Sequence, residues 1–150
     1  MSKENDQTTR TILLVEDNFG HVRLIQEALK EGTLVCELVA VKDGVEAMAY
    51  LRQEGPYRRS PRPSIILLDL NLPKKDGREV LAEIKADPHL KQIPVLVLTT
   101  SKHEEDILKS YELHANCYIN KSGDLKQLFK LVRSIEEFWL ETATLPSQRS

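Results

Sequence analysis

The stretch IILLDLNLP at residues 65–73 decides the fold class, because its first four residues are apolar without a break. A strand with one solvent-exposed face alternates apolar and polar residues. A strand of a parallel sheet is buried on both faces and is continuously apolar. The stretch VLVL at residues 95–98 has the same character. Both segments therefore predict inner strands of a parallel sheet whose two faces are covered by helices.

Five apolar runs predict the strands of this sheet, at 11–15, 34–41, 64–68, 94–98 and 117–119. Between them the apolar period changes to three and four, so that strand and helix alternate five times. That alternation is typical of the α/β class with a doubly wound sheet. Right-handed crossovers favour the strand order 2-1-3-4-5. We therefore expect a five-stranded parallel sheet flanked by five helices.

The expected helices are each marked by an apolar face. Asp43 and Asp76-Gly77 open the second and third helices, while Gly32, Gly55-Pro56 and Asp87-Pro88 end the first three. The apolar faces consist of Val22, Ile25, Ala28 and Leu29; Val45, Met48 and Leu51; Val80, Leu81 and Ile84; Ile107, Leu108 and Tyr111; and Leu125, Leu128, Phe129, Val132, Ile135, Phe138 and Trp139.

The length of 150 residues predicts one domain, at 11–142, with flexible tails at 1–10 and 143–150. The 21 basic and 23 acidic residues give a net charge of −2, which argues against direct DNA binding. No apolar run approaches the roughly 18 residues of a membrane helix, and the start lacks a signal peptide, so we expect a cytoplasmic protein. Cys36 and Cys117 are expected as small core residues on opposite edges of the sheet, where they cannot pair.

The chemistry is expected at the carboxyl ends of the strands, where ligands of doubly wound sheets bind. Glu16 and Asp17 follow the first strand, and Asp69 follows the third, its neighbour in the predicted order. At about 5 Å and an effective dielectric near 20, each pair of carboxylates repels by roughly 3 kcal/mol. Oxygen ligands of this kind suit Mg²⁺. With Thr99 after the fourth strand and Lys121 after the fifth, the set resembles a phosphoryl-transfer site with a carboxylate nucleophile.

These residues stand in motifs that resemble the receiver domains of two-component response regulators. The motifs are LLVEDN (13–18), LLDLNLP (67–73), Asp76-Gly77, LTT (98–100) and YINK (118–121), and the resemblance runs from about 11 to about 138. Within that family, LNLPKKDGREVL (70–81) and IEEFWL (135–140) are most similar to stand-alone cyanobacterial regulators that serve phytochrome histidine kinases. The resemblance implies the flavodoxin-like receiver fold.

The resemblance also implies a role for each site residue. Asp69 would accept a phosphoryl group from a sensor histidine kinase of the phytochrome type. Asp17 would bind Mg²⁺ directly, Glu16 mainly through a metal-bound water, and Asn71 through its backbone carbonyl, beside Asp69 itself. Lys121 would pair with the phosphoryl oxygens. The protein would then be a phosphoacceptor that assists its own phosphorylation and dephosphorylation, rather than an enzyme acting on other molecules.

The resemblance further implies a switch, in which Thr99 moves to the phosphoryl group and Tyr118 turns inward. The face formed by helix four, strand five and helix five would carry the signal. Because Phe138 and Trp139 lie beyond the reach of the sheet, we expect a homodimer or a partner contact there. Two positions depart from the family pattern: Glu16 stands where many members have Asp, and Ser122 replaces a Pro. The isomer of the bond between Lys121 and Ser122 therefore stays open.

Three other interpretations compete with this one. A phosphorylation-independent adaptor would keep these residues without using them. A flavodoxin-like cofactor binder would need a Gly, Ser or Thr-rich phosphate cradle after the first strand, where Glu16 and Asp17 stand, so no cofactor-binding residues are expected. A phosphatase with an acid nucleophile commonly has a second Asp where Asn71 stands. The loop at 55–63, with three prolines and three arginines, is either a basic docking surface or a stiffened connection.

Overall fold

The computed structural model of the protein describes residues 10–31, 36–99 and 117–120, together with the single helical positions 130, 133, 134 and 137. In chain order the elements are β1 (Arg10–Val15), α2 (Phe19–Lys30), β2 (Cys36–Val41), α3 (Gly44–Leu51), the 3₁₀ helix η1 (Gly55–Tyr57), β3 (Ile65–Asp69), α4 (Gly77–Ala86), β4 (Val95–Thr99) and β5 (Cys117–Asn120).

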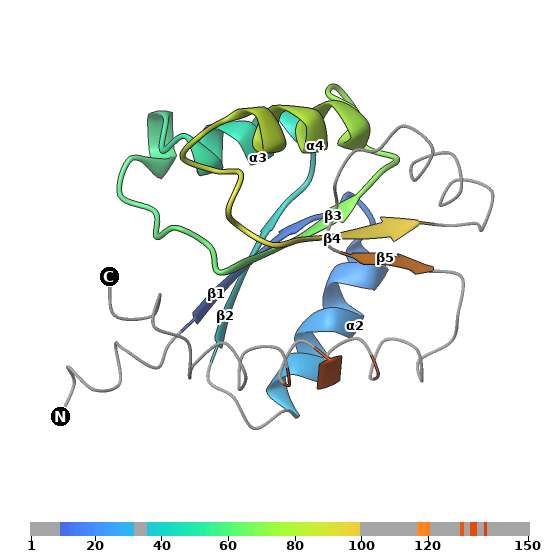
Figure 1. Ribbon diagram of the computed structural model, residues 1–150. Coiled ribbons are helices and arrows are strands. Elements are labelled where there is room, and N and C mark those ends of the chain that lie inside the picture. The colour runs from blue at the N-terminus through green and yellow to red at the C-terminus, as the bar shows by residue number, and fades with distance from the viewer. Residues whose placement is uncertain are drawn as a thin grey trace, which may run out of the picture.

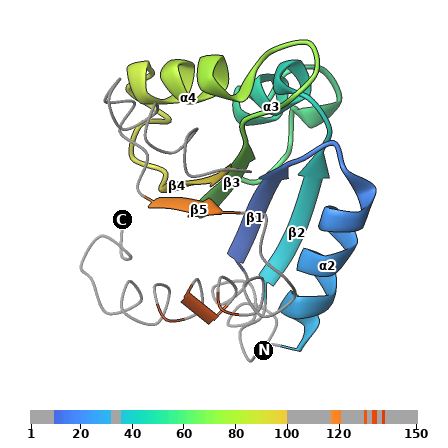
Figure 2. The ribbon, with the colours of Figure 1, turned by 90° about the vertical axis from the view of Figure 1, so that its right-hand side faces the viewer.

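The strands form a parallel sheet in the order β2-β1-β3-β4-β5. The helices α3 and α4 cover one face of the sheet, and α2 lies against the other (Figures 1 and 2). The predicted α/β class is thereby confirmed, with β2, β1, β3 and β4 in the predicted order. The predicted fourth helix lies outside the described residues, and of the predicted fifth helix only the four single positions are described.

The core is divided by the sheet into two apolar clusters. Successive side chains of a strand point to opposite faces, so each inner strand contributes to both clusters. Toward α3 and α4 point Leu13, Val15, Ile66 and Leu68. Toward α2 point Ile12, Leu14, Ile65 and Leu67. Each of these eight side chains is 1% exposed or less, which is the physical reason for the unbroken apolar runs in the sequence.

The expected apolar faces of α2 and α4 are buried throughout. In the second expected helix, Val45 was predicted wrongly, because its side chain is 53% exposed. The helix α3 begins at Gly44 after the N-cap Asp43, and it turns Ala47, Met48 and Leu51 toward the sheet. At 3.6 residues per turn, Val45 lies about 100° around the helix from the buried Gly44, at the edge of the buried face, where its side chain reaches solvent.

The ends of α3 and α4 follow different local rules. The helix α4 begins after a capping box formed by Asp76 and Glu79, and it ends at Asp87 before Pro88, as predicted. The helix α3 ends at Leu51, earlier than the predicted stop at Gly55, because Gln53 takes a left-handed φ of 56°. A left-handed residue cannot continue a right-handed helix.

The two cysteine-bearing strands, β2 and β5, lie at opposite edges of the sheet. Cys36 is half-buried against the cluster beside α2. The side chain of Cys117 and the two predicted tails lie outside what the structure describes, except that Arg10 begins β1. In the described part of the chain, no helix is both long and apolar enough to span a membrane.

Candidate functional site at the carboxyl ends of β1 and β3

The first two acidic residues of the site continue directly from β1. The backbone N–H of Glu16 donates to the carbonyl of Val41 over 2.9 Å, which extends the pairing with β2 by one residue. Glu16 is therefore fixed to the sheet, and it is only 2% exposed. Asp17, the next residue, is exposed.

The third acidic residue, Asp69, is the last residue of β3, the strand that pairs with β1. Its side chain lies in the same buried corner as that of Glu16, and it is also 2% exposed. One carboxylate oxygen from each of Glu16, Asp17 and Asp69 lies within 4.8 Å of the others. We call these three residues the acidic cluster. The sequence placed all three at this edge, and the structure brings them together.

Backbone N–H groups hold the two buried carboxylates in place. The N–H of Asn18 donates to Oε2 of Glu16 over 3.1 Å, and the N–H of Asn71 donates to Oδ1 of Asp69 over 3.2 Å. Asn18 also begins α2, because its Oδ1 accepts from the N–H groups of Gly20 and His21. Local turns that follow β1 and β3 thus orient the acidic cluster.

Gly77, the first residue of α4, allows that helix to start directly against the end of β3. A Cβ atom at this position would lie 2.3 Å from the carbonyl oxygen of Asp69 and 2.6 Å from Cα of Leu70. The N–H of Gly77 donates to the carbonyl of Leu70 over 3.0 Å. The position of the Asp69 backbone therefore depends on a residue without a side chain.

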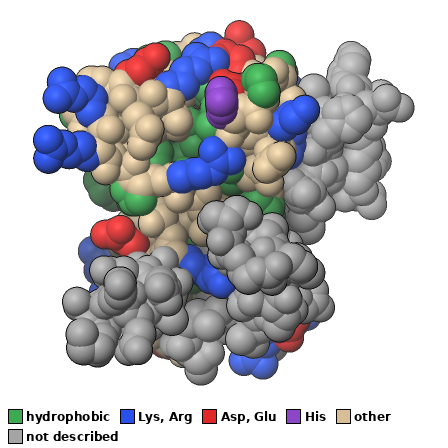
Figure 3. Space-filling model, turned by 60° about the vertical axis from the view of Figure 1, so that its left-hand side comes forward, with side chains coloured by type: hydrophobic (Ala, Val, Ile, Leu, Met, Phe, Trp, Pro, Cys, Tyr) green, Lys and Arg blue, Asp and Glu red, His purple; other side chains and the backbone are tan. Residues whose placement is uncertain are grey.

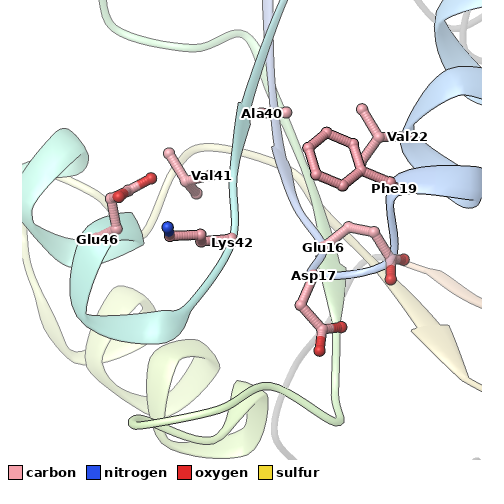
Figure 4. Close-up of a pocket in the computed structure, with 8 residues that line it drawn as sticks. All are labelled: Glu16, Asp17, Phe19, Val22, Ala40, Val41, Lys42 and Glu46. Carbon is pink, nitrogen blue, oxygen red and sulfur yellow. The ribbon is translucent and has the colours of Figure 1, made fainter.

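An open cavity of about 300 Å³ adjoins the acidic cluster, between the start of α2 and the start of α3 (Figure 4). Its lining consists of Glu16, Asp17, Phe19, Val22, Ala40, Val41, Lys42 and Glu46. Phe19 projects from α2 on one side and is 83% exposed, while Lys42 and Glu46 lie on the other side. The acidic cluster can therefore be reached from solvent.

Three basic residues near the site were not predicted from the sequence, namely Lys42 in the lining of the cavity, His21 and Lys74. Nδ1 of His21 lies 3.7 Å from Oε2 of Glu16, and Nζ of Lys74 lies 3.6 Å from Oδ2 of the buried Asp43. The N-cap residue Asn18 was a usable signal for His21, because it places His21 in the first turn beside the strand end. Lys74 gave no such signal, since its approach depends on a left-handed φ of 67°.

The other predicted site residues are described only by their place along the chain. Thr99 ends β4, directly after Leu98, the residue that pairs with Asp69. Tyr118 lies in β5, in register with Val97. The side chains of Thr99 and Tyr118 lie outside the described residues, as do Lys121 and its bond to Ser122.

The acidic cluster has the chemistry of a site for a hard divalent cation. It offers oxygen ligands alone, two of them from buried carboxylates, and Mg²⁺ typically takes one or two carboxylates and keeps several waters. Three carboxylates this close repel one another strongly in a partly buried corner, and a bound cation would offset that repulsion. The residues present therefore fit Mg²⁺.

The comparison with known families agrees with this geometry. Residues 12–133 match the model of the response regulator receiver domain. The chain belongs to the response regulator receiver family. The resemblance inferred from the motifs is thereby confirmed, and receiver domains in general bind Mg²⁺.

Similar proteins within this family include regulators of phytochrome signalling. The chain is 61% identical to the response regulator Rcp1 of Synechocystis over 147 residues, which cover 98% of this chain and 99% of Rcp1. The crystal structure of the phosphorylated cyanobacterial phytochrome response regulator RcpA superimposes with a TM-score of 0.82 at 67% identity, over 92% of this chain and 99% of RcpA. The Mn²⁺-bound form of Rcp1 gives a TM-score of 0.80 at 64% identity, over 91% of this chain and 99% of that chain. The predicted similarity to cyanobacterial phytochrome regulators is thus confirmed.

Proposed function

We propose that this receiver domain accepts a phosphoryl group on Asp69 from a sensor histidine kinase, with Mg²⁺ held by Glu16, Asp17, Asp69 and the backbone carbonyl of Asn71. The observation that carries the proposal is the convergence of the three carboxylates within 4.8 Å at the carboxyl end of the sheet. A phosphorylated relative and a Mn²⁺-bound relative support it.

The proposed transfer is a nucleophilic substitution at phosphorus. A carboxylate oxygen of Asp69 attacks the phosphorus atom of the kinase phosphohistidine, an O–P bond forms, and the P–N bond to the imidazole breaks. When bound, Mg²⁺ supplies positive charge that balances the phosphoryl oxygens. Lys121 pairs with one of those oxygens, and the Thr99 hydroxyl donates to another. The domain is then a phosphoacceptor that assists its own reaction and not an enzyme with a separate substrate.

The signal leaves the site through a change between two packings. The phosphoryl group stabilises the packing in which Thr99 has moved toward Asp69 and Tyr118 has turned inward. We propose that this change reaches the face formed by the predicted fourth helix around Ile107, by β5 and by the predicted fifth helix. Phe138 and Trp139 on the fifth helix would form a homodimer contact at this face. These elements complete a five-helix receiver domain that ends at residue 142, before a tail at 143–150. The N-terminal tail is shorter than the predicted 1–10, because Arg10 begins β1.

The input is proposed to be a phytochrome-type histidine kinase, because RcpA is described as a phytochrome response regulator and shares 67% of its sequence with this chain. The net charge of −2 supports signalling by protein contacts rather than direct DNA binding. The same composition, without an apolar run of membrane length, supports a cytoplasmic location.

The test is the intact mass of the protein after incubation with acetyl phosphate and Mg²⁺. We expect the mass to rise by one phosphoryl group when Mg²⁺ is present and to stay unchanged in EDTA. The Asp69→Asn variant should gain nothing, because its amide is not a nucleophile. Asp43→Asn is the matched control, since Asp43 is also a buried carboxylate but caps α3 outside the acidic cluster.

The outcome that would contradict the proposal is a folded protein that neither gains mass nor changes on addition of beryllofluoride, a mimic of the phosphoryl group. The phosphorylation-independent adaptor would then be the better interpretation. If the Asp69→Asn variant were phosphorylated as fully as the wild type, the phosphoryl acceptor would be a residue other than Asp69.

A further inference from the structure

The connection between α3 and β3 carries a concentration of positive charge that the proposed function does not use. We call residues 52–63 the arginine loop, because it contains four arginines and one glutamate in a chain with a net charge of −2. Arg58, Arg59 and Arg62 are all exposed. No ion pair among the described residues includes any of these three.

Arg52, at the start of the loop, has a different role from the other three arginines. Its Nη2 lies 3.2 Å from Oε1 of Glu83 on α4, and Lys75 pairs with the other oxygen of the same carboxylate. These contacts tie the end of α3 to α4. The remaining arginines are thus presented from a base that is fixed to the fold.

Side-chain contacts also hold the loop in one conformation. The hydroxyl of Tyr50 donates to the carbonyl of Pro61 over 2.9 Å, and Nε2 of Gln53 donates to the carbonyl of Ser60 over 2.8 Å. The rings of Tyr50 and Tyr57 meet edge to face, with centroids 5.3 Å apart and planes at 61°. Pro63 is buried where the loop leads into β3.

The two tyrosines keep their protons, so that these contacts persist at neutral pH. Burial, together with the carboxylate of Glu37 and the neighbouring Tyr57, raises the pKa of Tyr50 above its ordinary value of 10.0. Burial, the charge of Glu46 and a hydrogen bond to Glu46 raise the pKa of Tyr57. At pH 7, far below even the ordinary pKa of tyrosine, both hydroxyls are donors, and the raised pKa values extend this state to more alkaline pH.

The arginine loop lies apart from the acidic cluster. It leads to Ile65 at the amino end of β3, whereas Asp69 is at the carboxyl end of that strand. Ser64, just after the loop, donates to the carbonyl of Thr11 near the start of β1. Figure 3 looks onto the side of the molecule that carries the loop, where several Lys and Arg side chains reach solvent beside a few Asp and Glu side chains.

We propose that the arginine loop is a docking site for an acidic segment, rich in Asp and Glu, of a partner protein. Guanidinium groups match carboxylates in shape and charge, and Arg58, Arg59 and Arg62 have no ion pair within the described residues to break. A loop that is already held by Tyr50, Tyr57 and Gln53 loses little conformational entropy on binding.

A peptide fits this surface better than a nucleic acid does. A duplex carries about one charge per 1.7 Å and needs an extended basic surface. Here Arg58, Arg59 and Arg62 stand within one short loop, with Glu54 in the same loop and Glu83 at its base. Those carboxylates and the overall charge of −2 would repel a long polyanion but leave room for a few carboxylates.

The test is the fluorescence anisotropy of a short labelled peptide of alternating Glu and Ala, titrated with the full-length protein. The triple variant R58Q/R59Q/R62Q should bind it about tenfold more weakly, the effect of three exposed ion pairs lost together. The matched control R23Q/K30Q/K91Q removes the same charge from exposed positions elsewhere and should weaken binding by less than about threefold. Equal losses in the two variants would overturn the proposal, because the peptide would then respond only to total charge.

Two further arms separate this proposal from the alternatives. Tighter binding of a single-stranded DNA oligonucleotide or of phosphatidylserine vesicles than of the peptide would assign the loop to another class of partner and overturn the proposal. The Asp69→Asn variant should bind the peptide as the wild type does, and R58Q/R59Q/R62Q should still be phosphorylated by acetyl phosphate. A failure of the docking proposal can therefore be told apart from a failure of the proposed phosphorylation of Asp69.

Discussion

The acidic cluster and the arginine loop concentrate charges of opposite sign, but they are built in opposite ways. Glu16 and Asp17 come from the end of one strand and Asp69 from the end of another, and two of the three carboxylates are buried. The arginine loop draws its charge from one short segment of the chain, and Arg58, Arg59 and Arg62 all face solvent.

The difference shows how exposure decides the cost of bringing like charges together. Water and salt screen exposed charges, so three arginines can share a loop at little cost in stability. The buried carboxylates are screened far less, so a bound cation would offset a larger repulsion there. The acidic cluster should therefore respond to Mg²⁺ and to small changes in packing, and the arginine loop to neither.

The largest effect is expected from Gly77→Ala, which tests how tightly the acidic cluster is packed. The new methyl group would press on the carbonyl of Asp69, and we expect a loss of about 3 kcal/mol in the free energy of unfolding, measured in urea. Gly55→Ala in the arginine loop is the control. A Cβ there has nothing within 4 Å, so only the left-handed φ of 57° is strained, at a cost of about 1 kcal/mol. Equal losses of unfolding free energy in the two variants would show that the start of α4 is packed no more tightly than the arginine loop.

The next effect is the linkage between Mg²⁺ and stability. At about 100 times its dissociation constant, an ion that binds only the folded protein adds roughly 2.7 kcal/mol to the free energy of unfolding. We expect thermal denaturation to show this gain for the wild type and for R58Q/R59Q/R62Q. The Asp17→Asn variant should lose most of it and still fold, because Asp17 is exposed. If Mg²⁺ stabilised the Asp17→Asn variant as much as the wild type, Asp17 would not be a ligand of the metal.

The smallest effect concerns the internal support of the arginine loop. Tyr50→Phe removes the hydrogen bond to the carbonyl of Pro61 and should lower the free energy of unfolding by about 1 kcal/mol. R58Q/R59Q/R62Q should change it by less than about 0.5 kcal/mol, because those side chains are exposed. Urea denaturation of both variants measures these two free energies. A larger loss in the triple variant would mean that the arginines stabilise the fold.

Much of the fold could be predicted from the sequence because burial on both faces of a parallel sheet leaves unbroken apolar runs. Residues 65–68 and 95–98 indicated inner strands, and the acidic residues that follow the first and third strands indicated the edge at which the chemistry lies. The ordered combination of motifs between residues 13 and 121 was sufficient to identify the receiver family, which the match to 12–133 confirms.

The sequence was less informative where a side chain's surroundings depend on packing. The apolar character of Val45 predicted burial, but the packing of Gly44 against Lys75 and of Ala47 into the core sets the rotation of α3, so Val45 faces solvent. The approach of Lys74 to Asp43 likewise depends on a backbone angle, which residue type alone did not indicate.

The sequence by itself determined which groups stand at the ends of the strands, because strand periodicity and the order of residues are local properties. Only the tertiary structure decided that two of the three carboxylates of the acidic cluster are buried, and that Tyr50 and Tyr57 hold the arginine loop against α3. Distances between residues far apart in the chain are set by strand pairing and close packing. Those distances decide whether like charges need a counterion or are simply screened by water.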